Sequence, residues 1–217
     1  MTASKIRLYD YVASANCYKV RLLLAQLGRD YERIPIDIFD GHTLTDEYAA
    51  INPHRSTPVL ELADGRRLVE SNAILVHLAA GTEFLPDDPF ELAQVVRWLI
   101  YEQTDVMPMI GGLRFRLITG RITADKVARR REAAHEVLKI LDQHLGEHDF
   151  LAAGRYTVAD IAVYAYTHVA GDAGIELDPY PAVTAWLERV SSQPGFMDDL
   201  EPYPPNAQLG AGRSIYD

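Results

Sequence analysis

A serine and an asparagine stand where the chain passes from a first strand into a first helix. Ser14 and Asn16 follow the alternating segment 5–9 and precede apolar residues at helical spacing. A helix N-terminus offers free N–H groups and the positive end of the helix dipole, so it favours an anion such as a thiolate. The Ser14 hydroxyl could therefore donate a hydrogen bond to the sulfur of a ligand. It could equally cap the helix, and this segment alone leaves both roles open.

Cys17 is the one cysteine of the chain. It cannot form an internal disulfide, and a thiol–disulfide couple of the C-x-x-C type is excluded because Ser14 occupies the first of the two positions. We interpret Cys17 as a small packed hydrophobic residue. A nucleophilic role is the alternative, because helix N-termini can activate thiols, although no general base is evident nearby.

Two further segments have the character of a binding site. Thr57-Pro58-Val59 begins a strand, and a cis bond before a proline could expose backbone groups of Val59 to an extended ligand. Glu70 and Ser71 open a helix after a strand, where a hydroxyl and N–H groups could hold a carboxylate while Glu70 faces an ammonium group. The structural alternatives are a strand-starting proline and a helix cap. Together with Ser14, the pattern suits a small γ-glutamyl thiol peptide.

The elements around these residues predict two domains. Residues 1–81 show the order βαβ–ββα, an α/β domain whose sheet needs one parallel and one antiparallel pairing. Residues 82–89 hold two prolines and several acids and are predicted to be a linker. The first 80 residues carry 9 basic and 10 acidic side chains and the remainder 12 and 21, which supports two parts with different surfaces.

The second domain, residues 90–217, is predicted to be all-helical. Four stretches have amphipathic helical spacing: 90 to about 116, 124–145, 157 to about 170, and 181–192. Pro108 and Gly111-Gly112 predict a kink or break in the first of them. Residues 201–217, rich in proline and glycine, are expected to form an extended tail.

Composition excludes several classes of partner. The net charge of −10 has the wrong sign for binding a phosphate backbone, so no nucleic acid is expected. No 18-residue apolar stretch is present, and no membrane association is expected. The histidines show no convincing metal-ligand spacing, so no metal site is predicted. The single cysteine and the lack of a signal-like start predict a cytoplasmic protein.

Three motifs resemble those of the cytosolic glutathione transferases: the segments 14–21, 52–60 and 70–74. The resemblance covers essentially the entire chain and is closest to bacterial members with a serine, Nu-like or theta-like active-site pattern. It implies a thioredoxin-like N-terminal domain followed by an all-helical domain. It also implies that Ser14 stabilises the glutathione thiolate with help from Asn16; a class with a cysteine nucleophile matches less well. The glutathione-binding residues that it implies are Arg55, Thr57, Val59, Glu70 and Ser71.

One departure from the family pattern concerns Arg55 and Ser56, which stand where many members have a glycine and a lysine or glutamine. Arg55 could take over the lost contact, or the affinity for glutathione could be lower. Asp160, within Thr157-Val158-Ala159-Asp160, matches the family's helix-capping box and is interpreted as structural.

The resemblance implies a transferase that uses glutathione as cosubstrate, needs no cofactor, and adds the thiolate to a small hydrophobic electrophile, as in detoxification. The alternatives are a glutathione-dependent disulfide reductase and a non-catalytic binding protein of the same fold. A homodimer is implied as well, in which Asp105 could reach the partner's glutathione amino group. From their order along the chain, the residues expected to contact the electrophile are Tyr101, Met107, Met109, Ile110 and Phe115.

Overall fold

The computed structural model describes residues 5–212, and the last five residues of the predicted tail lie outside this range. The N-terminal part is a four-stranded sheet in the order β2-β1-β3-β4. β1 pairs parallel with β2 and antiparallel with β3, which pairs antiparallel with β4, so the predicted mixed sheet is confirmed. The strands are β1 Ile6–Asp10, β2 Tyr31–Pro35, β3 Val59–Glu61 and β4 Arg67–Val69.

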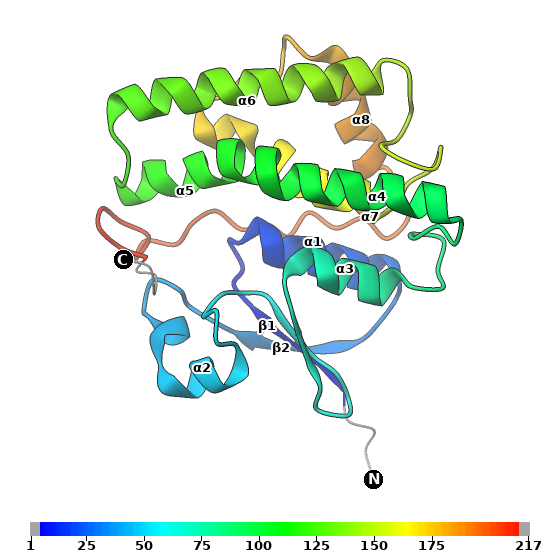
Figure 1. Ribbon diagram of the computed structural model, residues 1–217. Coiled ribbons are helices and arrows are strands. Elements are labelled where there is room, and N and C mark those ends of the chain that lie inside the picture. The colour runs from blue at the N-terminus through cyan, green and yellow to red at the C-terminus, as the bar shows by residue number, and fades with distance from the viewer. Residues whose placement is uncertain (1–4, 213–217) are drawn as a thin grey trace.

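Helices α1 and α3 separate this sheet from the helical part of the molecule (Figure 1). Leu8 of β1 and Leu60 of β3 sit opposite each other and are fully buried against this layer. α1 spans Ala15–Gln26 and buries nine of its residues, as expected for a helix with covered faces on both sides. α3 spans Ser71–Ala79.

A short helix, α2 Asp46–Ile51, and a 3₁₀ turn, η1 His42–Leu44, lie between β2 and β3 and were not predicted. Thr45 caps α2 by accepting a hydrogen bond from the backbone N–H of Tyr48 at 3.1 Å. Six residues make fewer than two turns, too few for a helical period to be visible in the sequence.

The C-terminal part is all-helical, as predicted. Its central helix, α7 Val158–Thr167, has all ten residues buried and contacts α1. The capping box at its start is confirmed: Asp160 accepts from the backbone N–H of Thr157 at 3.0 Å and also from the indole of Trp186 at 3.0 Å. The other helices are α4 Pro89–Tyr101, η2 Glu102–Gly111, α5 Gly112–Thr119, α6 Ala124–Leu145, η3 Ala170–Ala173 and α8 Pro181–Ser191.

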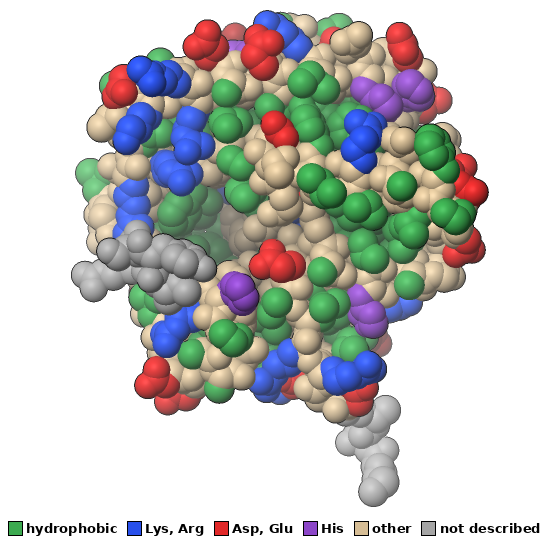
Figure 2. Space-filling view, viewed as in Figure 1, with side chains coloured by type: hydrophobic (Ala, Val, Ile, Leu, Met, Phe, Trp, Pro, Cys, Tyr) green, Lys and Arg blue, Asp and Glu red, His purple; other side chains and the backbone are tan. Residues whose placement is uncertain are grey.

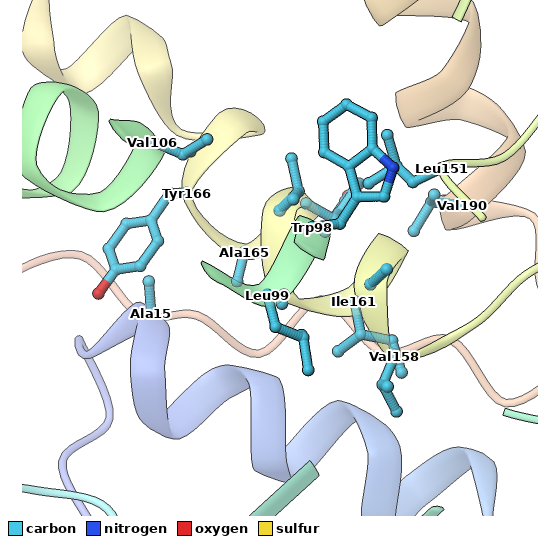
Figure 3. Packing of buried hydrophobic residues seen from close by; sticks show 14 of the residues in the cluster. Ala15, Trp98, Leu99, Val106, Leu151, Val158, Ile161, Ala165, Tyr166 and Val190 are labelled. Atoms are coloured by element: carbon cyan, nitrogen blue, oxygen red, sulfur yellow. The ribbon is translucent and has the colours of Figure 1, made fainter. Parts of the chain in front are cut away.

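The kink or break predicted near Pro108 takes the form of a π-helix, η2, which runs without interruption from α4 into α5. Pro108 has no N–H to donate, and the wider π turn keeps the chain helical where regular α geometry is disfavoured. Most of the buried hydrophobic residues of both parts form one continuous cluster, in which the Trp98 and Tyr166 side chains lie between helices (Figure 3).

The segment after α8 is extended, and it runs back along the boundary between the two parts (Figure 1). Asp199 pairs with the buried Arg21 of α1 at 2.8 Å, and Asn206 donates to Asp37 at 2.9 Å. This segment therefore contributes to the interdomain surface. None of the helices within residues 5–212 is long and apolar enough to span a membrane.

Candidate active site

The predicted catalytic serine caps α1 at the boundary between the two parts. Ser14 has extended backbone angles, and its Oγ accepts a hydrogen bond from the backbone N–H of Cys17 at 3.4 Å. The hydroxyl is half-buried and lies beside the Cys17 thiol, where its hydrogen bond to the sulfur partly opposes the rise in that thiol's pKa. Because a hydroxyl rotates, its proton can turn from the Cys17 sulfur to a ligand at the positive end of the α1 dipole.

A cavity of about 240 Å³ lies beside Ser14, between the β1–α1 loop and the helical part. Space-filling representation shows a hollow with hydrophobic walls in this region (Figure 2). Of the five residues expected to contact an electrophile, Met107 and Phe115 line it. The Tyr101 hydroxyl instead donates to the carbonyl of Val137 at 3.1 Å, and Ile110 is fully buried in the core. Met109 is partly buried and packs against the core.

The cavity has further walls that the sequence analysis missed. They are mainly aromatic and apolar, with one cation, and comprise Tyr11, Ala15, Ile38, Gly111, Gly112, Arg114, Tyr166 and Tyr203. Tyr203 comes from the C-terminal segment, where it lies 4.4 Å from the Arg114 guanidinium. Arg114 also pairs with Asp172 at 2.7 Å. Of these residues, Tyr11, three positions before Ser14, and Ala15, directly after it, lie close enough to Ser14 in sequence for their places to be anticipated.

Cys17 is fully buried, in a small cluster with Tyr11 and Ala13. Its Sγ accepts a hydrogen bond from the backbone N–H of Tyr11 at 3.4 Å. Burial raises the pKa of the Cys17 thiol to about 12, with the nearby Asp10 carboxylate acting in the same direction. The geometry thus favours the packed role over the nucleophilic one.

Asn16 and Ser71, predicted for opposite ends of the ligand, are in direct contact. The Ser71 hydroxyl donates to Oδ1 of Asn16 at 3.1 Å, and Nζ of Lys19 donates to the same oxygen at 2.9 Å. Ser71 begins α3 and is buried, whereas Glu70 before it is exposed. The Ser71 hydroxyl proton is already used, so the backbone N–H groups at the start of α3 are what this position offers to a carboxylate.

Glu70 has the backbone angles φ 68° and ψ 114°. A residue other than glycine in this region is strained by about 1–3 kcal/mol, and such strain is typical of binding sites. The conformation turns the chain from β4 into α3 and leaves the Glu70 side chain exposed, with no side-chain hydrogen bond or ion pair to another residue within 5–212. Its carboxylate is thus available to a cationic group of a ligand.

The bond between Thr57 and Pro58 is cis. Val59 is fully buried within the sheet, opposite Tyr9 on one side and Val69 on the other. Thr57 precedes the strand and is half-buried, and no other described residue forms a backbone hydrogen bond with it. The backbone of Thr57, more than that of Val59, is therefore open to an extended ligand.

Arg55 has its guanidinium turned towards α2. It donates to the carbonyl of Leu44 and lies 3.5 Å from the carboxylate of Asp46. Its position thus fastens the loop before β3 to η1 and α2. No group of three or more potential metal-ligating side chains lies together in the part of the chain that the structure describes.

The arrangement is a thioredoxin-like domain with a serine hydroxyl at a helix N-terminus, joined to a helical domain across a cavity. Models of the glutathione S-transferase N-terminal and C-terminal domains match residues 8–83 and 106–194. The chain belongs to the glutathione S-transferase family. Family members bind glutathione as substrate or ligand and need no cofactor.

Three relatives illustrate the range of the family. The disulfide-bond oxidoreductase YfcG of Escherichia coli is 30% identical over 94% of this chain and 97% of its own. A glutathione S-transferase from Pseudomonas fluorescens Pf-5 has a solved structure that is 38% identical, with a TM-score of 0.88 over 91% of this chain and 100% of its own. Yeast Ure2p in complex with glutathione is 25% identical, with a TM-score of 0.83 over 90% of this chain and 97% of its own.

Proposed function

We propose that the protein is a glutathione transferase in which Ser14 stabilises the thiolate of bound glutathione for attack on a small hydrophobic electrophile. The observation that carries the proposal is the Ser14 hydroxyl, which borders the apolar cavity at the start of α1 and can turn its proton towards a ligand there. Asn16 assists at the same helix terminus. The activity would suit the removal of reactive compounds.

The energies involved are of the right size. A free thiol has a pKa of about 8.5, and lowering that pKa to about 6.5 requires roughly 2.7 kcal/mol. A hydrogen bond to a charged group contributes about 1.5–3 kcal/mol, and a helix N-terminus about 0.3–1 kcal/mol. Ser14 and the α1 dipole together therefore suffice without a metal ion.

The rest of glutathione would extend from Ser14 along the N-terminal domain. Thr57 would pair with its peptide backbone at the edge where β3 begins, with Val59 and Arg55 holding that edge in place. The start of α3 at Ser71 would bind the γ-glutamyl carboxylate, and Glu70 its ammonium group. The electrophile would lie in the cavity between Met107 and Phe115.

A second activity is glutathione-dependent disulfide reduction. It is supported by Asn16 together with the similarity to YfcG, which is named a disulfide-bond oxidoreductase. In this reaction the thiolate attacks one sulfur of a small disulfide and forms a mixed disulfide while the other sulfur leaves as a thiolate. A second glutathione then releases the remaining thiol, so that two glutathione molecules are oxidised to glutathione disulfide.

A homodimer in the cytoplasm completes the proposal. Three large apolar side chains, Phe90, Val96 and Ile100, are exposed along α4. Figure 2 shows hydrophobic side chains gathered over the region of α4 on this face. A second copy of the chain packed against these side chains would remove their apolar surface from water. In the dimer, Asp105 of η2 would approach the partner's glutathione amino group.

Calorimetric titration with glutathione is the first test, because absence of binding would leave only the non-catalytic alternative. Turnover of chlorodinitrobenzene and of hydroxyethyl disulfide, each with glutathione, then separates the two activities. The transferase proposal predicts the larger kcat/KM with the aryl halide. A preference for the disulfide would assign the reductase activity to the same site.

A further inference from the structure

A buried ion pair joins the two domains beneath the candidate active site. Nζ of Lys19 on α1 lies 2.9 Å from Oε2 of Glu102, the first residue of η2, and both side chains are fully buried. Removing two charges from water costs several kcal/mol per ion, so such a pair contributes little to stability by itself. Its position next to Asn16 indicates a different role.

The pair determines which way the Asn16 carboxamide faces. The ammonium group of Lys19 can only donate, so the atom that it meets at 2.9 Å must be the oxygen Oδ1. The Ser71 hydroxyl donates to the same oxygen at 3.1 Å. Nδ2 consequently faces away from both groups. None of the described residues accepts a hydrogen bond from it, and Asn16 is partly exposed.

Several contacts hold the Lys19 ammonium in this place. Asn72 accepts from it at 3.3 Å through Oδ1, and the same Asn72 donates through Nδ2 to Glu102 at 2.8 Å. The ring of Tyr166 lies 5.1 Å from Nζ and adds a cation–π contact. Lys19 is thus enclosed by a carboxylate, an amide oxygen and an aromatic face, and its orientation is restricted.

The π-helix η2 brings the helical domain to this cluster. Gly111, at its end, lies so close to the ring of Tyr166 that an added Cβ would be 2.2 Å from Cε1. Tyr166 therefore packs directly on the backbone of η2, and it lies beside Ala15 at the start of α1 (Figure 3). Glu102, at one end of η2, pairs with Lys19. Gly111, at the other end, packs against the Tyr166 ring that faces Lys19.

We propose that Lys19 and Glu102 are positioning residues that present Nδ2 of Asn16 as a hydrogen-bond donor to the sulfur of the bound thiol. The ion pair acts through Asn16 and does not touch the ligand. The inference rests on the proposed function, because it requires a sulfur ligand at Ser14. Through Glu102, the helical domain would then help to lower the pKa of the bound thiol.

The test replaces both charges together, Lys19→Met with Glu102→Gln, so that no single charge stays buried and Asn72 keeps its acceptor. The thiolate of bound glutathione is followed by its ultraviolet absorbance against pH. The pair variant should raise the pKa of the bound thiol, so that the thiolate fraction at neutral pH falls about tenfold. In an Asn16→Ala background, the same pair should cause no further fall.

The matched control is the exposed pair of α6, Lys139→Met with Glu136→Gln, whose side chains lie 2.6 Å apart. It should leave the thiolate fraction unchanged. If the buried pair variant lowers the thiolate fraction equally with and without Asn16, the pair does not act through Asn16 and the inference is wrong. Should the pair variant not fold, Lys19→Leu with Glu102→Gln removes the same two charges with a different side-chain shape and should lower the fraction in the same direction.

Nuclear magnetic resonance of the ligand-free protein separates this inference from the proposed function. The side-chain amide signal of Asn16, assigned by its loss in Asn16→Ala, should shift in the buried pair variant and stay in place in the α6 control. An unshifted signal overturns the inference whether or not glutathione binds. If the signal shifts but the protein binds no glutathione, the result supports the positioning of Asn16 by the ion pair and disproves the proposed function.

Discussion

Ser14 accepts a hydrogen bond from the backbone N–H of Cys17 at 3.4 Å, so one hydroxyl caps α1 with its lone pair and keeps its proton for another partner. The two roles that the sequence left open for Ser14 are therefore compatible. A hydroxyl can accept and donate at once, and the cap fixes its oxygen at the helix terminus.

Ser14→Ala removes both roles, and the two losses can be measured separately. Loss of the cap should cost about 1 kcal/mol in the free energy of unfolding. Loss of the hydrogen bond to the thiolate should lower kcat roughly 10- to 150-fold, because a bond to a charged group is worth about 1.5–3 kcal/mol. Steady-state kinetics and denaturant unfolding provide the two measurements.

Asp88→Ala is the matched control. Asp88 caps α4 by accepting from the backbone N–H groups of Phe90 and Glu91, each at 3.0 Å. This variant should lose a similar free energy of unfolding while kcat stays unchanged. Equal losses of kcat in both variants would show that Ser14 acts only through stability.

Cys17 should resist alkylation in the folded protein. Its pKa is raised to about 12 by burial, whereas an unfolded cysteine ionises near pH 8.5. Iodoacetamide should therefore react roughly 3000-fold more slowly with the folded chain than with the chain in guanidinium, as followed by mass spectrometry. Because the unfolded chain releases this proton at lower pH than the folded chain, the free energy of unfolding should fall as the pH rises from about 9 towards 12. Rapid alkylation of the folded protein at pH 8 would contradict the buried assignment.

Local patterns predicted the sheet, the main helices and the capping box because each depends on residues close together in sequence. The cavity depends on residues that are far apart in the sequence. Tyr203 of the C-terminal segment packs on Arg114 of α5, and no periodic pattern in the sequence relates either residue to Ser14. The contact between Lys19 and Glu102 likewise needs η2. Pro108 predicted a disruption of the helix there, but the spacing of apolar residues did not show that the chain continues as a π-helix that brings Glu102 to Lys19.

Ile100→Glu should turn the proposed homodimer into a monomer. Ile100 is 57% exposed on α4, and a carboxylate buried there between two copies would be unpaired. Light scattering at micromolar concentration should give about twice the chain mass of 24.3 kDa for the unaltered protein and the mass of one chain for the variant. Ile140→Glu is the control, since Ile140 on α6 is similarly exposed, at 53%, but does not lie on α4. The mass of one chain for the unaltered protein would disprove the dimer.

Glu70→Gly should separate binding from stability at the start of α3. Glycine adopts the backbone angles of Glu70 without strain, which relieves about 1–3 kcal/mol, while its greater freedom in the unfolded chain costs roughly 0.4–1 kcal/mol. The free energy of unfolding should therefore stay level or rise. The affinity for glutathione should fall, because the carboxylate proposed to meet the ligand's ammonium group is gone.

Glu70→Gln is the companion variant, because it keeps the strained backbone and removes only the charge. The γ-glutamyl end of glutathione lies away from the sulfur and keeps its charge through the reaction, so both variants should raise KM and leave kcat nearly unchanged. Calorimetry, steady-state kinetics and denaturant unfolding measure the three quantities. If Glu70→Gly lowers the free energy of unfolding while KM for glutathione stays the same, the strained conformation serves the fold and Glu70 is no part of the binding site.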